Sequence, residues 1–343
     1  MNSVRRVGIV VAAALAAVAV VGSPASAAPA ESCAEVEIPV TADLAVAAQV
    51  HGTYCTPVGR QPRTVQLLVH GATYDRRYWN EAFDVPAAAA ADGYATLAID
   101  KLGYGESTHL PSVLITAETE SAAVHQVITA LRGGAVGGHA YDRVALVGHS
   151  LGSIEAMAEA GTYHDVDYLV LTGMTHYLSL DILARTFTQH LYPAVLDAQV
   201  GPVAGLDAGM LTSIPGHRGA LFDGDTASAA AVARDEATKD VLSATEADGA
   251  VQALSVLPLT NSFSITVPVL IENGAADVLF CGGVLGISCA TADSIDHAER
   301  GFFPRAPRFT AIAVPGAAHS LTLSPSAAEA TSDIDGWLTR QSA

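Results

Sequence analysis

Short apolar runs recur along this chain and are separated by longer segments that suit helices. The runs predict strands that begin at Val65, Ala95, Val144 and Tyr168. Helices are predicted between them, near 80–91, near 117–131 and after Ser150. Strands and helices that alternate in this way need crossover connections and form a parallel sheet. Two further runs, at 36–40 and 45–54, precede the alternation and suit an antiparallel start to the same sheet.

A long interval, about 174–263, interrupts this α/β pattern before the next predicted strand at 265–271. The interval is too long for a plain connection. A spacing of four residues, typical of one helix face, relates Leu183, Phe187, Leu191 and Val195. Because an insertion between these strands emerges at the carboxyl edge of the sheet, where ligands bind, we predict a helical cap over that edge. Helices packed as an ordinary side layer are the alternative.

The first residues have the pattern of a secretory signal. Two arginines precede an apolar stretch at 7–21, and Ala25-Ser26-Ala27 supplies the small residues after which a signal peptidase cuts. The stretch is shorter than the ~20 residues that cross a bilayer. We therefore predict a signal peptide at residues 1–27 and a single domain over 28–343. The mature protein is expected to be secreted, without a stable membrane anchor.

Composition limits the partners of the chain. Half of its 343 residues are hydrophobic, which is enough for one large core. Lys and Arg together number 17 against 35 Asp and Glu, and the formal net charge is -18. Such a balance repels nucleic-acid phosphates, so no nucleic-acid partner is expected. The composition does not indicate an oligomeric state.

Residues 144–153 read V-A-L-V-G-H-S-L-G-S and carry the best candidate nucleophile. The apolar run ends at Gly148, Ser150 stands at the centre of G-H-S-L-G, and a helix-compatible segment follows. A strand-to-helix reversal this tight forces the serine backbone into a strained conformation, and flanking glycines remove the Cβ clashes. Ser150 is therefore predicted to expose its hydroxyl at the tip of the sheet. A glycine-flanked loop serine is the alternative.

A nucleophilic serine needs a base, and the base needs a carboxylate that orients it. The strand-like run 309–314 is followed by a loop that holds His319. A neutral imidazole there could take the proton of Ser150 and return it to the leaving group. The acid candidate is Asp277, which a glycine turn delivers after an apolar strand. Glu272, at the end of that strand, is the rival.

An oxyanion site is predicted where another strand ends. The run 65–69 is followed by His70, Gly71 and Ala72, and the glycine lets the chain turn so that amide hydrogens face the nucleophile. We expect the amides of Ala72 and Leu151 to hold the developing oxyanion. His70 is expected to shape this loop by hydrogen bonding rather than to act as a second base.

A D-x-x-G-x-G-x-S turn that begins at Asp100 completes a set of motifs spanning nearly all of the predicted mature chain. The order serine, aspartate, histidine is that of α/β-hydrolases and not of chymotrypsin-like or subtilisin-like proteases. The chain resembles the α/β-hydrolase superfamily, in its branch of secreted bacterial serine esterases and lipases. The resemblance implies an α/β-hydrolase fold in which Ser150 is the nucleophile, Asp277 the acid and His319 the base.

Four cysteines, Cys33, Cys55, Cys281 and Cys289, could form disulfides after secretion. Counting allows three pairings. We favour Cys33–Cys55 and Cys281–Cys289, because each pair brackets a short segment that could form a hairpin or a loop. No C-x-x-C pattern occurs, so neither a metal site nor a redox site is expected, and no cofactor is expected either.

Together with the triad candidates, the resemblance implies a carboxylic ester hydrolase of the esterase, lipase or lactonase type, which forms an acyl-enzyme on Ser150. Its substrate would be a small-molecule ester or lactone. Phe187, Leu191 and Leu211, apolar residues of the interval 174–263, are candidates to line the substrate pocket. Serine at the elbow argues against haloalkane dehalogenases and epoxide hydrolases, which place aspartate there.

Two other functions stay open. A peptidase of the proline-iminopeptidase type shares the triad and would need acidic residues to bind the amine of its substrate. Asp207, Asp223 and Asp225 are candidates for that role. A non-catalytic binding protein with the same fold is the second alternative; such proteins lack a triad member, whereas all three triad candidates are present here.

Overall fold

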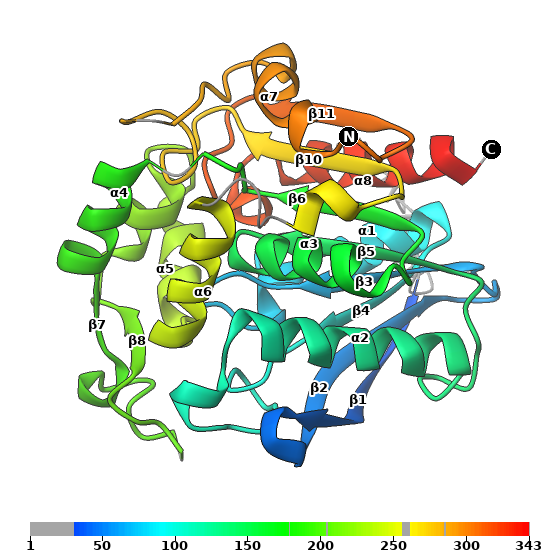
Figure 1. The fold of residues 1–343 in the computed structure, drawn as a ribbon, viewed down its shortest axis with the longest axis horizontal. Helices are drawn as coiled ribbons and strands as arrows, with labels where there is room; N and C mark the ends of the chain where they lie inside the picture. The colour runs from blue at the N-terminus through cyan, green and yellow to red at the C-terminus, as the bar shows by residue number, and fades with distance from the viewer. Residues whose placement is uncertain (1–30, 178, 204, 256–260, 285, 343) are drawn as a thin grey trace, which may run out of the picture.

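The computed structural model describes residues 31–342 except positions 178, 204, 256–260 and 285, so the predicted signal peptide, residues 1–27, lies outside the described residues. An eight-stranded sheet occupies the centre of the molecule, in the order β1-β2-β4-β3-β5-β6-β10-β11 (Figure 1). Its strands are β1 (Glu31–Ala42), β2 (Val46–Pro57), β3 (Thr64–Val69), β4 (Ala95–Ile99), β5 (Arg143–His149), β6 (Tyr168–Thr172), β10 (Val269–Gly274) and β11 (Phe309–Val314).

The sheet is antiparallel at one edge and parallel elsewhere. β1 pairs with β2, and β2 pairs with β4, in antiparallel register. The other neighbouring strands of this sheet pair in parallel register. β3, β4 and β6 are buried along their whole length. Strands that are covered on both faces need no polar side, which is why these runs are apolar without alternation. The mostly parallel sheet predicted from the sequence is confirmed.

Helices flank this sheet. α1 (Val85–Asp92) packs with α8 (Ala327–Ser342), α2 (Ala117–Gly133) with α3 (Leu151–Tyr163), and α7 (Ala292–Glu299) against β11 (Figure 1). Among the described residues, no helix combines the length and the apolar character that crossing a membrane requires.

Local capping sets where these helices begin and end. α2 begins as predicted, because the hydroxyl of Thr116 accepts a hydrogen bond from the amide of Thr119. It ends at Gly134, whose φ of 76° suits a helix C-terminus. α1 begins later than the predicted residue 80. Asp84 caps it, and Pro86 fits only in the first helical turn.

Between β6 and β10 the chain forms an insertion that is not purely helical. Its elements are α4 (Leu180–Arg185), β7 (Leu191–Pro193), β8 (Met210–Ser213), α5 (Ala229–Ala237), β9 (Leu242–Ser243) and α6 (Ala244–Ser255). β7, β8 and β9 form a separate antiparallel sheet. In Figure 1 these elements lie together on one side of the central sheet.

Two boundaries near this insertion differ from the sequence prediction. The helix suggested by the spacing from 183 to 195 ends at His190, after a turn of π-helix, and Leu191 starts β7. That strand exists because it pairs with β8, a contact that local spacing cannot reveal. The strand predicted from residue 265 begins at Val269 instead, directly after Pro268, which has no amide hydrogen to give to a neighbouring strand.

Candidate active site

Ser150 alone connects β5 to α3. Its backbone has a φ of 55° and a ψ of -119°, a conformation that costs energy for a residue other than glycine. Two glycines allow the close packing of the turn. A Cβ on Gly148 would lie 2.4 Å from the carbonyl oxygen of Gly152, and a Cβ on Gly152 would lie 2.4 Å from that of His70. The turn therefore needs small residues at both positions in order to present the serine.

The side chains of Ser150, His319 and Asp277, which stand on three separate loops, meet beyond the carboxyl edge of the sheet. His319 Nε2 lies 2.9 Å from Ser150 Oγ, and His319 Nδ1 lies 3.0 Å from Asp277 Oδ2. All three residues are buried. When Nδ1 donates its hydrogen to the carboxylate, Nε2 is free to accept the serine proton. The structure thus brings together the three residues that the sequence analysis selected as nucleophile, base and acid.

Asp277 lies in a turn directly after β10. Its Oδ1 accepts hydrogen bonds from the amides of Leu279 (2.7 Å) and Phe280 (3.2 Å), while Oδ2 faces His319. The rival acid, Glu272, is fully buried within β10, and neither of its carboxyl oxygens has a hydrogen-bond partner in the described part of the chain. Burial raises the pKa of Glu272 well above its ordinary value. This favours the uncharged acid over the anion that an orienting role requires.

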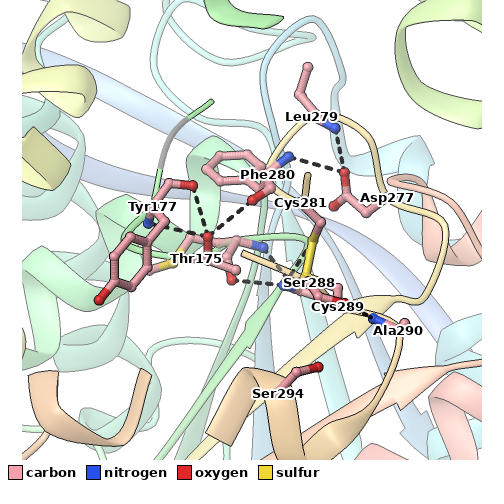
Figure 2. The surroundings of a disulfide bond; sticks show 12 residues. Thr175, Tyr177, Asp277, Leu279, Phe280, Cys281, Ser288, Cys289, Ala290 and Ser294 are labelled. Atoms are coloured by element: carbon pink, nitrogen blue, oxygen red, sulfur yellow. Dashed lines mark hydrogen bonds between the residues drawn. A yellow bond between two sulfur atoms is a disulfide. The ribbon is translucent and has the colours of Figure 1, made fainter. Parts of the chain in front are cut away.

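A disulfide closes the chain beside the loop of Asp277. Figure 2 shows Cys281 bonded to Cys289, next to Phe280, whose carbonyl oxygen accepts a hydrogen bond from the Thr175 hydroxyl at 3.2 Å. The other disulfide, Cys33–Cys55, joins directly paired residues of β1 and β2 at the antiparallel edge of the sheet. These are the two pairings that the sequence analysis favoured.

The loop after β3 places Ala72 beside the nucleophile. Gly71 packs so closely that a Cβ there would lie 2.9 Å from the Cβ of Ser150, and Ala72 lines the same cavity as Ser150. His70 Nδ1 donates to the carbonyl oxygen of Gly71 (2.9 Å), and its Nε2 accepts from the amide of Lys101 (3.2 Å). Burial, and then the charge of Lys101, lower the pKa of His70 well below its usual value. A neutral His70 with both nitrogens engaged fixes the shape of this loop.

A buried arginine of the insertion, Arg218, holds the same loop. Its Nη1 donates to the carbonyl oxygen of Thr73 (3.1 Å) and to its hydroxyl (2.8 Å), while Nε and Nη2 bind Asp235 at 2.7 and 2.8 Å. Thr73 directly follows Ala72 and has a φ of 60°, which needs support in a residue other than glycine. The sequence analysis missed Arg218, because no local pattern points to a partner 145 positions away.

The insertion also contacts His319. The carbonyl oxygen of Phe222 accepts a hydrogen bond from the amide of His319 at 3.0 Å. The rings of Phe222 and Phe280 stack on the imidazole, each with its centroid 5.7 Å away. A second imidazole, that of His149, lies 4.9 Å from His319, and burial, followed by the charge that His319 can carry, lowers the pKa of His149 well below its usual value. His319 therefore lies among aromatic rings and a neutral imidazole.

An apolar cavity of about 100 Å³ lies beside Ser150 and Leu151. Its walls include Leu183, Phe187, Leu191, Leu221, Leu254 and Phe280, and none of its described lining residues is charged. Of the three pocket residues suggested by the sequence, Phe187 and Leu191 line this cavity. Leu211 is not among its described lining residues; it lies on β8, where it pairs with Pro193 of β7 and Leu242 of β9.

The acidic residues considered for binding an amine have other surroundings. Asp207 accepts hydrogen bonds from the amides of Ser112 (2.9 Å) and Gly209 (2.8 Å). Asp223 is buried, and burial raises its pKa to about 7. Neither of them, nor Asp225, is among the described residues that line the cavity.

The fold has relatives among solved structures. An esterase from Thermogutta terrifontis aligns over 90% of this chain and 98% of its own, with a TM-score of 0.57 and 18% identity. A Paleococcus ferrophilus monoacylglycerol lipase aligns over 84% of this chain and 98% of its own, with a TM-score of 0.56 and 18% identity. The enol-lactonase of Burkholderia xenovorans LB400 aligns over 88% of this chain and 99% of its own, with a TM-score of 0.54 and 14% identity. At these identities the likeness shows the fold alone.

In sequence, no curated protein matches the chain. A family model, that of the alpha/beta hydrolase family, matches residues 66–332. The matched stretch contains the elbow at Ser150, the acid loop at Asp277 and the loop of His319. It covers more than half of the chain and agrees with the observed sheet, so the chain belongs to the alpha/beta hydrolase family.

Proposed function

We propose that the protein is a serine hydrolase that cleaves carboxylic esters through an acyl-enzyme on Ser150. The observation that carries this proposal is the hydrogen-bonded chain from Ser150 Oγ through His319 to Asp277, at 2.9 and 3.0 Å. A serine hydroxyl is a weak nucleophile at neutral pH unless an adjacent base takes its proton as it attacks. The strained elbow and the buried imidazole supply this arrangement before any substrate arrives.

In the first half of the reaction, His319 Nε2 takes the hydroxyl proton while Ser150 Oγ attacks the ester carbonyl. The carbonyl oxygen becomes an oxyanion, which we assign to the amides of Ala72 and Leu151. The carboxylate of Asp277 accepts the Nδ1 hydrogen and stabilises the imidazolium that forms. His319 then returns the proton to the leaving alcohol, and the acyl group stays on Ser150.

The second half repeats these steps with water as the nucleophile. His319 takes a proton from the water as it attacks the acyl carbonyl, and the same amides hold the second oxyanion. When that intermediate collapses, the proton returns to Ser150 Oγ and the carboxylic acid leaves. Arg218 takes part only as a positioning residue, because it fixes Thr73 next to the oxyanion loop.

The cavity supports an ester or lactone with an apolar acyl part as the substrate. Its uncharged walls suit an alkyl or aryl group and offer no carboxylate to the free amine that an aminopeptidase must bind. The three structural relatives are described as an esterase, a monoacylglycerol lipase and an enol-lactonase, and all fall within this substrate range. The iminopeptidase is therefore the weaker alternative.

We also propose that residues 174–263 act as a cap and that the protein is secreted. Leu183, Phe187, Leu221 and Leu254, all from this interval, form much of the cavity beside Ser150. Secretion rests on the signal-like sequence at 1–27 and on two disulfides, which persist in oxidising compartments.

A substrate series tests the proposed function. The mature protein is assayed with p-nitrophenyl esters of increasing acyl length, with a lactone and with a prolyl arylamide. We expect turnover of the esters and no turnover of the arylamide. Cleavage of the arylamide without cleavage of the esters would favour the iminopeptidase, and the absence of turnover on every substrate would favour a binding protein.

Replacing Phe187 or Leu191 with alanine should shift the preferred acyl length. Both side chains line the cavity, and losing a few methylene groups from a pocket is worth about 1–3 kcal/mol, so relative rates along the ester series should change by about 10- to 200-fold. Leu211→Ala is the matched control, because it removes the same kind of side chain outside the cavity. An unchanged acyl-length profile in both pocket variants would show that the cavity does not bind the acyl group.

Removing the Cys281–Cys289 bond should affect activity more than removing the other disulfide. The double alanine variant frees the chain next to Asp277, and a misplaced acid loop should lower kcat by roughly 10- to 100-fold. The double variant at Cys33 and Cys55 is the control, and it should lose about 2–4 kcal/mol of unfolding free energy with kcat unchanged. Ester turnover and urea unfolding measure the two effects. Equal losses of kcat in both variants would contradict the assignment.

A further inference from the structure

A second cluster of polar side chains lies outside the catalytic cavity. His125 comes from α2, Glu159 from α3, and Asp165 from the loop between α3 and β6. One ligand atom of each, an imidazole nitrogen or a carboxylate oxygen, lies within 4.8 Å of those of the other two. His125 Nδ1 is 2.7 Å from Asp165 Oδ2 and 3.8 Å from Glu159 Oε1.

Glu159 is the unusual member of this cluster. Its side chain is 0% exposed, and both carboxyl oxygens are buried without a hydrogen-bond partner in the part of the chain that the structure describes. Asp165 Oδ1 is buried and unpartnered as well. Buried carboxyl groups are normally hydrogen-bonded or bound to a metal ion, so these unpartnered oxygens point to a cation as their partner.

Neighbouring groups orient the other two members. The ring of Tyr163 stacks on the imidazole of His125, with centroids 3.9 Å apart and an interplanar angle of 8°. Arg132 Nε and Nη2 donate to the carbonyl oxygen of Asp165 at 2.9 and 2.6 Å. These contacts hold the nitrogen and the carboxylate close together without using the atoms that would bind a metal ion.

We propose that His125, Glu159 and Asp165 bind one Zn²⁺ ion through Nδ1 and two carboxylate oxygens, with water as the fourth ligand. One imidazole and two carboxylates are ligands that Zn²⁺ accepts. Bonds of about 2.0–2.1 Å in a tetrahedron place ligand atoms about 3.3 Å apart. The observed 2.7 and 3.8 Å bracket that separation, and the two carboxylate oxygens lie within 4.8 Å of each other, so small side-chain shifts would complete the site. The bound ion would join the end of α3 to α2.

Another cluster of one imidazole and two carboxylates makes a useful comparison. Glu35, His51 and Glu106 also lie within 4.8 Å of one another, but both carboxylates are exposed. Arg76 Nη2 already binds them, at 3.3 Å from Glu35 and 2.5 Å from Glu106. Because a cationic side chain fills the space between these carboxylates, we expect no Zn²⁺ there.

Zinc binding to the intact mature protein tests the proposal. The protein is stripped with EDTA, exchanged into chelator-free buffer and titrated with zinc chloride in a calorimeter and in thermal unfolding. We expect about one equivalent to bind. Tm should rise by roughly 3–5 °C when free Zn²⁺ is 100-fold above Kd. Ester turnover should not need the ion.

Matched variants identify the site. Glu159→Gln keeps the size of the side chain but replaces the carboxylate ligand with a neutral amide, so it should lose the Tm shift. His125→Gln should also lose the Tm shift. Because the His125 side chain is half-buried, this variant provides the test if the Glu159 variant does not fold. His51→Gln should keep the full shift. No shift in the wild-type protein, or a shift that survives in both Glu159→Gln and His125→Gln, would overturn the proposal.

Discussion

Ser150→Ala should keep the fold and lose ester hydrolysis by at least about 10⁴-fold in kcat/KM. Without Oγ there is no atom to form the acyl-enzyme, and His319 has no proton to take. Labelling by a fluorophosphonate, which reacts with an activated serine, should disappear together with turnover. Steady-state rates on a p-nitrophenyl ester measure the first effect, and gel detection of the label measures the second.

His319→Ala should fail to nearly the same degree, because a serine without its base is a neutral alcohol and triad members act as a unit. His51→Gln is the control, since His51 also contacts carboxylates but lies on β2. It should keep wild-type rates. If Ser150→Ala retained turnover within about 10-fold of wild type, with an unchanged circular dichroism spectrum, another nucleophile would have to be sought.

Asp277→Asn should lower kcat by about 10³- to 10⁴-fold with little change in stability. The asparagine has the shape of the aspartate, but it lacks the charge that stabilises the imidazolium, and its amide hydrogen can turn His319 into the wrong tautomer. The 3.0 Å contact between His319 Nδ1 and Asp277 Oδ2 is the interaction that changes. Ester kinetics and thermal unfolding measure the two quantities.

Glu272→Gln is the matched substitution for this prediction. Glu272 is the other carboxyl at the end of β10, and its raised pKa favours the neutral acid, which glutamine resembles. Its kcat should stay close to wild type. The opposite pattern, near-normal turnover in Asp277→Asn and a large loss in Glu272→Gln, would move the acid role to Glu272.

The sequence predicted most of the central sheet because buried parallel strands are apolar along their whole length. The runs at 168–172 and 309–314 have the same bounds as β6 and β11. Prediction was poorer where pairing with a distant strand decides the local structure. The spacing of four from 183 to 195 suits a helix, yet the chain leaves the helix at His190 because β7 pairs with β8.

The sequence also predicted some residues of the candidate site and not others. Asp277 and His319 were selected because each follows a strand that ends at the same edge of the sheet, and the structure brings both to Ser150. Leu211 was selected for its apolar character alone, which does not distinguish a pocket wall from a residue packed in a small sheet. Arg218 was overlooked, because an arginine is usually exposed and only its burial against Thr73 reveals its role.

The sequence by itself determined the tight turn at Ser150, since a Cβ on Gly148 would clash with the backbone of Gly152 four residues later. The need for glycine at position 152 comes instead from the distant backbone of His70. The sequence also determined the parallel sheet, because alternating strands and helices of this length leave few other connections. Only the tertiary structure decided which distant groups meet. Arg218 reaches the backbone of Thr73, 145 positions away, and Glu159 of α3 lies buried beside His125 of α2, because packing brings separate elements into contact. Such contacts leave no periodic trace in the sequence.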